Sequence, residues 1–233
     1  MTATPGAPRR GRRRALDEEE VVETALALLD GGGVEAMSIR GIAARLGVAP
    51  NAVYTYFPDK AALVRAVVER LLGEVDHGVF ADRARPWRER VEAVAVELRT
   101  RLSAHPAAVG LVIGGPMDGA HALSLNEQLL RLLGEAGLDP VEAARASYLL
   151  IVYIFGSIAL EVADADRSGP LPAEPARLLE RRRRFAATPA DLHPLTAAAA
   201  PVMAGYVSND QYVWGLHRVL DGIAVGTSAL EGS

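Results

Sequence analysis

Cysteine is absent from the 233 residues of this sequence, which excludes disulfide bonds and thiolate metal sites and fits a reducing cytoplasm. Aromatic residues make up only 5% of the chain, and lysine occurs once, at Lys60. Alanine and leucine are abundant instead, which favours packed helices over sheets. No segment has the alternating pattern of a strand. The composition therefore predicts an all-α protein.

Motifs of common enzymes are also lacking. The sequence has no G-x-S-x-G elbow, no phosphate loop of the G-x-x-x-x-G-K type and no H-E-x-x-H. No two histidines stand at the i, i+3 or i, i+4 spacing of a helical metal site; they are His77, His105, His121, His193 and His217. The sequence thus indicates no enzyme, no metal and no cofactor. An enzyme with an appended binding domain is the remaining enzymatic alternative.

The most apolar run covers residues 146–160, ASYLLIVYIFGSIAL, between Arg145 and Glu161. Fifteen residues are too few to cross a hydrocarbon core of about 30 Å. We expect a helix that is buried on nearly all sides and no association with a membrane. The arginine-rich start lacks the apolar segment that a signal peptide needs.

Charge is unevenly distributed. The formal net charge is −4, yet residues 1–14 carry five arginines and no acidic residue. A basic segment on an acidic body suggests DNA contact at one end of the molecule. The prolines and glycines among these arginines predict a disordered arm over residues 1–15. Such an arm either settles on phosphates and the minor groove or stays a solvated tail.

The stretch from Ser38 to Lys60 has the spacing of a helix-turn-helix. Ser38 is suited to cap a helix that ends at Leu46, and Gly47 suits the left-handed end of that helix. Pro50 then presets the first turn of a second helix, which we expect to end at about Tyr56. A short helix held out in this way can enter a DNA major groove.

The outward positions of this stretch carry polar and aromatic side chains. Asparagine pairs well with adenine and arginine with guanine, so Asn51 and Arg40 are the candidates for base contacts. Hydroxyl groups and the lysine suit phosphates. The predicted DNA-binding residues are Ser38, Arg40, Pro50, Asn51, Ala52, Tyr54, Thr55, Tyr56 and Lys60.

A resemblance to a known family rests on this region. LGVAPNAVYTYFPDKAAL resembles the motif of the TetR family of repressors. LNEQLLRLLGEAGL and YVWGLHRVLDGI are similar to its tetracycline-repressor branch. The resemblance implies a homodimer that binds palindromic double-stranded operator DNA and is released by a small-molecule inducer. The expected organisation is a basic arm at residues 1–15, a three-helix DNA-binding domain at residues 16–62 and a helical-bundle regulatory and dimerisation domain at residues 63–233.

Helical spacing continues through the body. A first helix is expected from Asp17 to Asp30, where three glycines at 31–33 should end it. A rigid helix from Lys60 to Leu72 should carry motion from the DNA-binding head to the body. Further helices are predicted over residues 87–104, 119–136, 140–163, 195–205 and 210–229, with a short apolar turn at residues 107–113.

The apolar stripes at residues 146–160 and in the last helix are larger than a monomeric bundle requires. They either pack wholly within one chain or form a four-helix interface between two chains. The resemblance favours the homodimer, because the corresponding helices dimerise in that family. The predicted interface residues are Val152, Phe155, Val213, Leu216, Leu220 and Ile223.

The resemblance also implies a ligand pocket inside the body. Gln128 matches a drug-binding glutamine of the tetracycline-repressor branch, but Leu111 stands where that branch has a magnesium-binding histidine. We therefore expect a more apolar ligand than a tetracycline–magnesium chelate. The predicted ligand-binding residues are Asp76, His77, Leu111, Gln128, Leu132, Tyr148 and Tyr153. Two alternatives remain: these residues are plain core, or the protein is a DNA-binding regulator controlled by a protein partner without a small-molecule ligand.

Overall fold

The computed structural model describes residues 16–163 and 171–230, with side chains described up to residue 224, so the predicted basic arm lies outside these residues. Every regular element in this part of the chain is a helix, which confirms the all-α fold class. The helices are α1 (Glu18–Ala36), α2 (Ile39–Leu46), α3 (Pro50–Tyr54), α4 (Lys60–Gly73), α5 (Gly78–Ala81), α6 (Trp87–Ala104), α7 (Pro106–Gly114), α8 (Ala120–Glu135), α9 (Pro140–Ala163), α10 (Glu174–Ala186), α11 (Pro194–Met203) and α12 (Asn209–Leu230).

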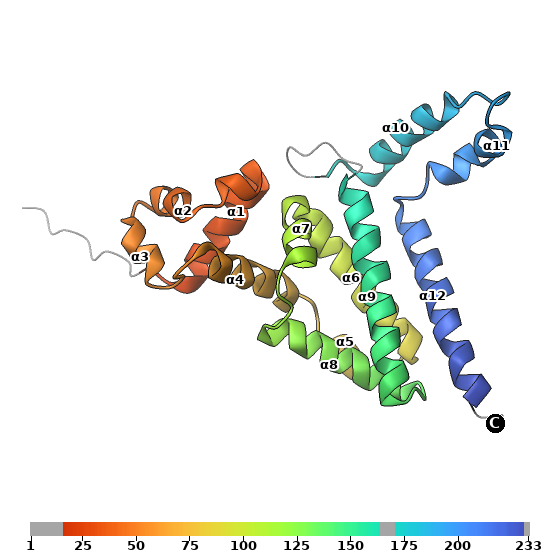
Figure 1. The fold of residues 1–233 in the computed structure, drawn as a ribbon, viewed down its shortest axis with the longest axis horizontal. Coiled ribbons are helices and arrows are strands. Elements are labelled where there is room, and N and C mark those ends of the chain that lie inside the picture. The colour runs from red at the N-terminus through yellow and green to blue at the C-terminus, as the bar shows by residue number, and fades with distance from the viewer. Residues whose placement is uncertain (1–15, 164–170, 231–233) are drawn as a thin grey trace, which may run out of the picture.

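Helices α1 to α3 form a small head at one end of the molecule (Figure 1). Asp17 caps α1 by accepting a 2.8 Å hydrogen bond from the Glu20 amide. The predicted glycines do interrupt this helix, but at Gly33 rather than directly after Asp30. The chain breaks helical geometry only at Gly33, where φ is 70°, and the element continues to Ala36. Each of the three glycines can adopt either helical angles or a positive φ, so a run of glycines does not fix which one breaks the helix.

The turn between α2 and α3 forms as the sequence predicts. The Ser38 hydroxyl accepts a 3.1 Å hydrogen bond from the Gly41 amide, and Gly47 ends α2 with φ 66°. Pro50 begins α3, which ends two residues earlier than expected. Val53 is fully buried against α2, so the outer face of α3 is held away from the rest of the head.

Helix α4 leaves the head and enters the body without a break, crossing the predicted boundary at residues 62–63 (Figure 1). Asp59 caps it, accepting a 2.8 Å hydrogen bond from the Ala62 amide. On its way it packs against α1, α7 and α8. A second contact between head and body is made by α1 on α7, where Asp30 Oδ2 lies 2.8 Å from His105 Nδ1.

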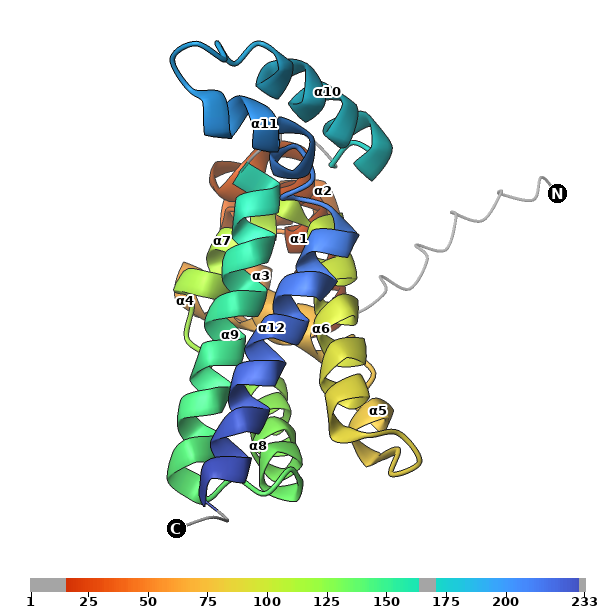
Figure 2. The same cartoon turned by 90° about the vertical axis from the view of Figure 1, so that its right-hand side faces the viewer.

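The body is a bundle in which α9 packs against α6, α7, α8 and α12. Helices α9 and α12 form its outermost layer on the side away from the head (Figure 2). The expectation that residues 146–160 are buried on nearly all sides is wrong. Leu150, Ile154 and Ile158 are buried, but Tyr148 and Leu160 are 70% and 71% exposed. One side of α9 packs on the bundle while the other carries apolar residues to the surface.

Helix α9 has the bounds predicted from the sequence, residues 140–163, and extends beyond the apolar run on both sides. With 24 residues, α9 is long and apolar enough to cross a membrane. It is the one helix in the described ranges of which this is true. Its inner face packs in the same core cluster as residues of the head. This arrangement is that of a core helix in a globular body.

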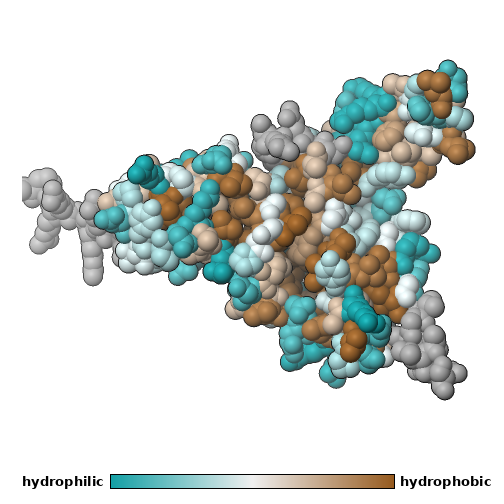
Figure 3. Space-filling model, in the orientation of Figure 1, coloured by the Kyte–Doolittle hydropathy of each residue, from teal (hydrophilic) through white to brown (hydrophobic). Residues whose placement is uncertain are grey.

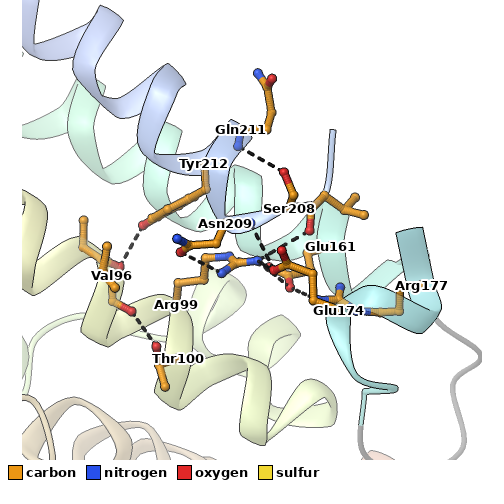
Figure 4. A network of polar contacts seen from close by, with 12 residues as sticks. Val96, Arg99, Thr100, Glu161, Glu174, Arg177, Ser208, Asn209, Gln211 and Tyr212 are labelled. Atoms are coloured by element: carbon orange, nitrogen blue, oxygen red, sulfur yellow. Dashed lines mark hydrogen bonds and ion pairs between the residues drawn. The ribbon is translucent and has the colours of Figure 1, made fainter. Parts of the chain in front are cut away.

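Helices α10 and α11 form a hairpin that projects beyond the bundle (Figure 1). Neither helix contains a buried residue. A cluster of ion pairs ties the hairpin to the body (Figure 4): Glu161 on α9 binds Arg99 of α6 at 2.8 Å and Arg177 of α10 at 2.6 Å. Glu174 adds a 3.3 Å contact to Arg99 and accepts a hydrogen bond from the Asn209 amide at the start of α12.

Candidate DNA interface and ligand cavity

The predicted DNA-contacting side chains lie together on the outer surface of α2, α3 and the start of α4. Ser38 and Ala52 are half-buried, and the others are exposed: Arg40, Pro50, Asn51, Tyr54, Thr55, Tyr56 and Lys60. The Thr55 hydroxyl donates a 3.1 Å hydrogen bond to the backbone carbonyl of Asn51, four residues earlier. The exposed face of α3 carries no acidic residue, so it suits a polyanion.

Two of the predicted phosphate-binding residues also hold the head together. The Lys60 ammonium donates a 3.1 Å hydrogen bond to the Val34 carbonyl, next to the break in α1. The Tyr56 hydroxyl donates to the Leu16 carbonyl. These contacts fix the ends of α1 relative to the turn, and they place both polar groups at the edge of the α3 face.

Arg45 is an exposed cation that the sequence-based prediction omitted. It lies in the last turn of α2, where a positive charge also favours the helix dipole. The available signal was its position on α2, because Arg45, like Arg40, falls outside the buried face formed by Ile39, Ile42 and Ala43.

A cavity of about 590 Å³ lies in the body. Its walls come from α4 to α9, and apolar side chains dominate them: Leu72, Phe80, Val91, Val94, Leu98, Val112, Ile113, Met117, Ala122, Leu123, Leu125, Asn126, Leu129, Tyr148, Leu150, Ile151, Val152, Ile154, Phe155, Gly156 and Ala159. The polar side chains in this lining are Asn126 and Tyr148. The Ser147 hydroxyl donates a 3.2 Å hydrogen bond to the side-chain oxygen Oδ1 of Asn126. On the face drawn in Figure 3, apolar side chains gather over the middle of the body, where the surface is hollowed.

Of the predicted ligand-binding residues, the structure places Tyr148 in the cavity wall. The others lie outside the lining: Asp76, His77, Leu111, Gln128, Leu132 and Tyr153. Gln128 Nε2 lies 2.6 Å from His77 Nδ1, so these two side chains bind each other. Leu132 is part of the buried core, and Leu111 is partly buried and packs against this core.

Tyr153 faces the opposite side of α9. Its ring stacks on Tyr212 of α12, with ring centroids 5.8 Å apart, and its hydroxyl donates a 2.6 Å hydrogen bond to the Tyr212 carbonyl. Burial raises the pKa of both tyrosine hydroxyls above the ordinary value, so both stay protonated donors. The pair joins α9 to α12 and does not reach the cavity.

The predicted dimer residues divide into two groups. Leu216, Leu220 and Ile223 are buried within this single chain, because that face of α12 packs on α9 and α6. The structure therefore places them in the core of one protomer. Val152 is exposed, while Phe155 and Val213 are half-buried. The exposed apolar residues of this layer that the prediction omitted are Val141, Tyr148, Leu149, Leu160 and Trp214.

A short exposed helix behind a glycine turn, joined through one continuous helix to a body with an apolar cavity, defines a helix-turn-helix transcription regulator. Residues 21–67 match the profile described as bacterial regulatory proteins, tetR family. Residues 81–226, more than half of the chain, match that of the tetracyclin repressor-like C-terminal domain. This protein belongs to the TetR family of transcriptional regulators.

Similar proteins are transcriptional regulators rather than enzymes. The HTH-type transcriptional repressor DrrR1 of Streptomyces coeruleorubidus is 28% identical over 228 residues, covering 94% of this chain and 81% of that protein. The tetracycline repressor protein class A from transposon 1721, of Escherichia coli, is 29% identical over 210 residues, covering 90% and 91%. The crystal structure of the Streptomyces coelicolor TetR family protein ActR in complex with (S)-DNPA shares the fold, with a TM-score of 0.76, 22% identity and coverage of 91% and 99%.

Proposed function

We propose that this protein is a homodimeric repressor that binds a palindromic operator in the cytoplasm and is released by a small, mostly apolar molecule. The observation that carries the proposal is the cavity of about 590 Å³. This volume lies within the range of about 300–1,000 Å³ typical of small-molecule sites. An apolar wall with a few polar groups is also typical of such sites, and here Asn126 and Tyr148 supply donors and acceptors that can orient a ligand.

The identity of the wall argues against a tetracycline–magnesium chelate. A hard cation such as Mg²⁺ needs oxygen ligands, and no carboxylate is among the lining residues. Leu111 has no group that binds a metal, and Gln128 is engaged by His77 outside the cavity. The favoured ligand is an apolar molecule with a few hydrogen-bonding groups.

The connection from cavity to DNA runs through α4. Leu72, near the end of this helix, lines the cavity, while Lys60 at its start lies beside the DNA-contacting face. A ligand acts only through its different affinity for two conformations of the protein. In one conformation the two heads of the dimer fit successive half-sites, about 34–36 Å apart, and in the other they do not.

The homodimer is supported by the outer layer of α9 and α12. Tyr148, Val152 and Leu160 form an exposed apolar stripe along α9, and Trp214 is exposed on the neighbouring helix α12. Contiguous apolar surface of this kind is typical of a protein interface. Two copies packed through these helices form a four-helix interface that covers the stripe.

Operator selection followed by ligand titration tests the proposal. Duplexes selected from a random library should contain an inverted repeat, as a two-fold dimer requires. An apolar compound that binds the wild-type protein should release this duplex and should bind the protein–DNA complex more weakly by the same factor, about 5–150-fold. Equal ligand affinity with and without operator would contradict the release mechanism and favour a regulator that has no small-molecule inducer.

A further inference from the structure

One face of α4 is in contact with the segment that begins α8. Arg65, Glu69 and Gly73 are spaced four residues apart and therefore share a face of the helix. The Arg65 Nε donates a 3.2 Å hydrogen bond to Asp118 Oδ1. Gly73 lies against the ring of His121, where an added Cβ would be 2.9 Å from Nε2. Residues 118–122 thus follow this face of α4.

Glu69 lies at the centre of this contact and caps α8. Its two carboxylate oxygens accept hydrogen bonds from the His121 amide at 2.8 Å and the Ala122 amide at 3.2 Å. These first-turn amides have no partner within their own helix, and Gly119 at the N-cap has no side chain to offer. A carboxylate at this position is further stabilised by the helix dipole. Helix α4 therefore provides the cap that α8 lacks.

Gly119 is the residue that makes room for this cap. A Cβ at position 119 would overlap the Glu69 carboxyl group. By contrast, α9 is capped by Asp139, the residue that directly precedes it. Asp139 Oδ1 accepts hydrogen bonds from the Val141 amide at 2.8 Å and the Glu142 amide at 2.9 Å. Asp139 and Glu69 each hold two amides of a cavity-lining helix, but only Glu69 does so from the helix that leads to the DNA-binding head.

The cap also touches the cavity. Ala122, whose amide binds Glu69, is a lining residue, and Leu125, Asn126 and Leu129 on the same helix continue the wall. A hydrogen bond weakens steeply when its geometry is lost. A ligand that shifts the first turns of α8 must therefore move α4 with it or break the cap.

We propose that Glu69 is the positioning residue that couples the cavity to the DNA-binding head. The inference rests on the proposed function, and it assigns the coupling to a single side chain on α4. The packing of α1 on α7, with the contact between Asp30 and His105, is the rival connection from body to head.

A cavity-filling side chain replaces the unidentified ligand in the test. Leu129→Trp projects extra volume into the cavity, and Val94→Phe does so from α6. The operator probe is a duplex selected from a random library with the wild-type protein. We expect each filling variant to weaken operator binding by at least about fivefold, the lower end of typical coupling. In the Glu69→Ala background this factor should fall towards one.

Asp139→Ala is the matched control, since it removes an equivalent cap from α9. Both alanine variants should lower the melting temperature by about 1–8 °C, the range for a lost cap in a chain of this size. In the Asp139→Ala background Leu129→Trp should still weaken operator binding by its full factor. Glu69→Gln keeps one acceptor oxygen and the overall shape, so the filling variants should retain an intermediate factor in its background. It serves as the second test if Glu69→Ala folds poorly.

The outcomes separate the two proposals. If the filling variants weaken operator binding equally with and without Glu69, the assignment to Glu69 is wrong while the proposed function stands. Loss of the factor in His105→Ala but not in Glu69→Ala assigns the coupling to α1 and α7. If neither filling variant changes operator affinity in the wild-type background, the release mechanism fails, and the role of Glu69 fails with it.

Discussion

Asn51 presents a side-chain amide on the exposed face of α3, where its backbone carbonyl is already bound by Thr55. The two hydrogen-bonding ends of the amide match the edge of adenine. We expect Asn51→Ala to reduce discrimination at one base pair of each half-site by about 1–3 kcal/mol. Repeating the operator selection with the variant measures this effect. Recovery of an unchanged operator motif would rule Asn51 out as a base-reading residue.

Lys60 is predicted to contact a phosphate rather than a base. A lysine that contacts phosphate contributes equally to all sequences, so Lys60→Gln should weaken every duplex by a similar factor and lower the salt slope of binding by about one unit. Because its ammonium also binds the Val34 carbonyl, thermal unfolding of the variant serves as the control. A change in sequence preference with an unaltered salt slope would contradict a phosphate contact.

The residues of the head were predictable because local chemistry determines them. Ser38 caps α2 and Gly47 ends it through interactions within a few residues, and such signals are present in the sequence. The cavity wall was not predictable in this way. Tyr148 and Tyr153 stand on the same apolar helix, and only packing against α12 turns Tyr153 away from the cavity.

At the scale of the elements, the buried ion cluster holds α6, α9 and α10 together. The Glu161 side chain is 4% exposed and contacts two arginines. Glu161→Ala would leave Arg99 and Arg177 with buried charge, and losing one partner of a buried pair typically costs about 3–5 kcal/mol. Urea unfolding at fixed protein concentration measures the loss. The control, Glu127→Ala, removes an exposed pair with Arg131 and should change stability by less than about 1 kcal/mol. Equal effects would show that burial does not matter.

Helix α8 is joined to α5 and α6 by Arg90, which donates to the Phe80 carbonyl at 2.9 Å and to Glu135 at 2.7 Å. The hydrogen bond from Arg90 holds the pKa of Glu135 below its usual 4.5. A lowered pKa in the folded state stabilises the protein above pH 4.5, and this contribution disappears as the pH falls through the lowered value. Glu135→Gln should therefore be less stable than wild type at neutral pH and approach it in acid. A stability difference that does not change with pH would contradict this role.

The helices themselves were predicted well, because long periodic segments bounded by proline and glycine have few alternatives. Helix α6 has the bounds expected from the sequence, whereas the short apolar segment before Gly114 forms α7 rather than a turn. Residue-level periodicity did not show which apolar side of α9 packs inward. That choice depends on contacts with α6, α7, α8 and α12, which lie far apart in the sequence.

At the scale of the whole molecule, the exposed stripe on α9 leads to a prediction about assembly. Leu160 is 71% exposed and lies outside the cavity lining, so Leu160→Asp leaves the protomer core intact. We expect light scattering to show a wild-type dimer and a largely monomeric variant, because the charge would be buried against an apolar partner. Leu195→Asp, at an exposed leucine of α11, is the control and should remain dimeric. A monomeric wild-type protein at micromolar concentration would exclude the proposed interface.

Ile223→Asp, on the buried face of α12, should act on folding rather than on assembly alone. Ile223 is buried within one chain, so a carboxylate there should unfold the protomer rather than only separate two protomers.

The α10–α11 hairpin should unfold locally before the rest of the protein. Neither of its helices contributes a residue to the apolar core, and the ion cluster in which Arg177 of α10 binds Glu161 is its main described tie to the bundle. Its free energy of local unfolding should therefore be well below that of the bundle. Amide hydrogens of α10 and α11 should exchange with solvent at low denaturant, while those of α6 and α9 exchange only on global unfolding. A protease that captures this open form would cut the chain between α9 and α12 while the head and the core around α6 remain folded.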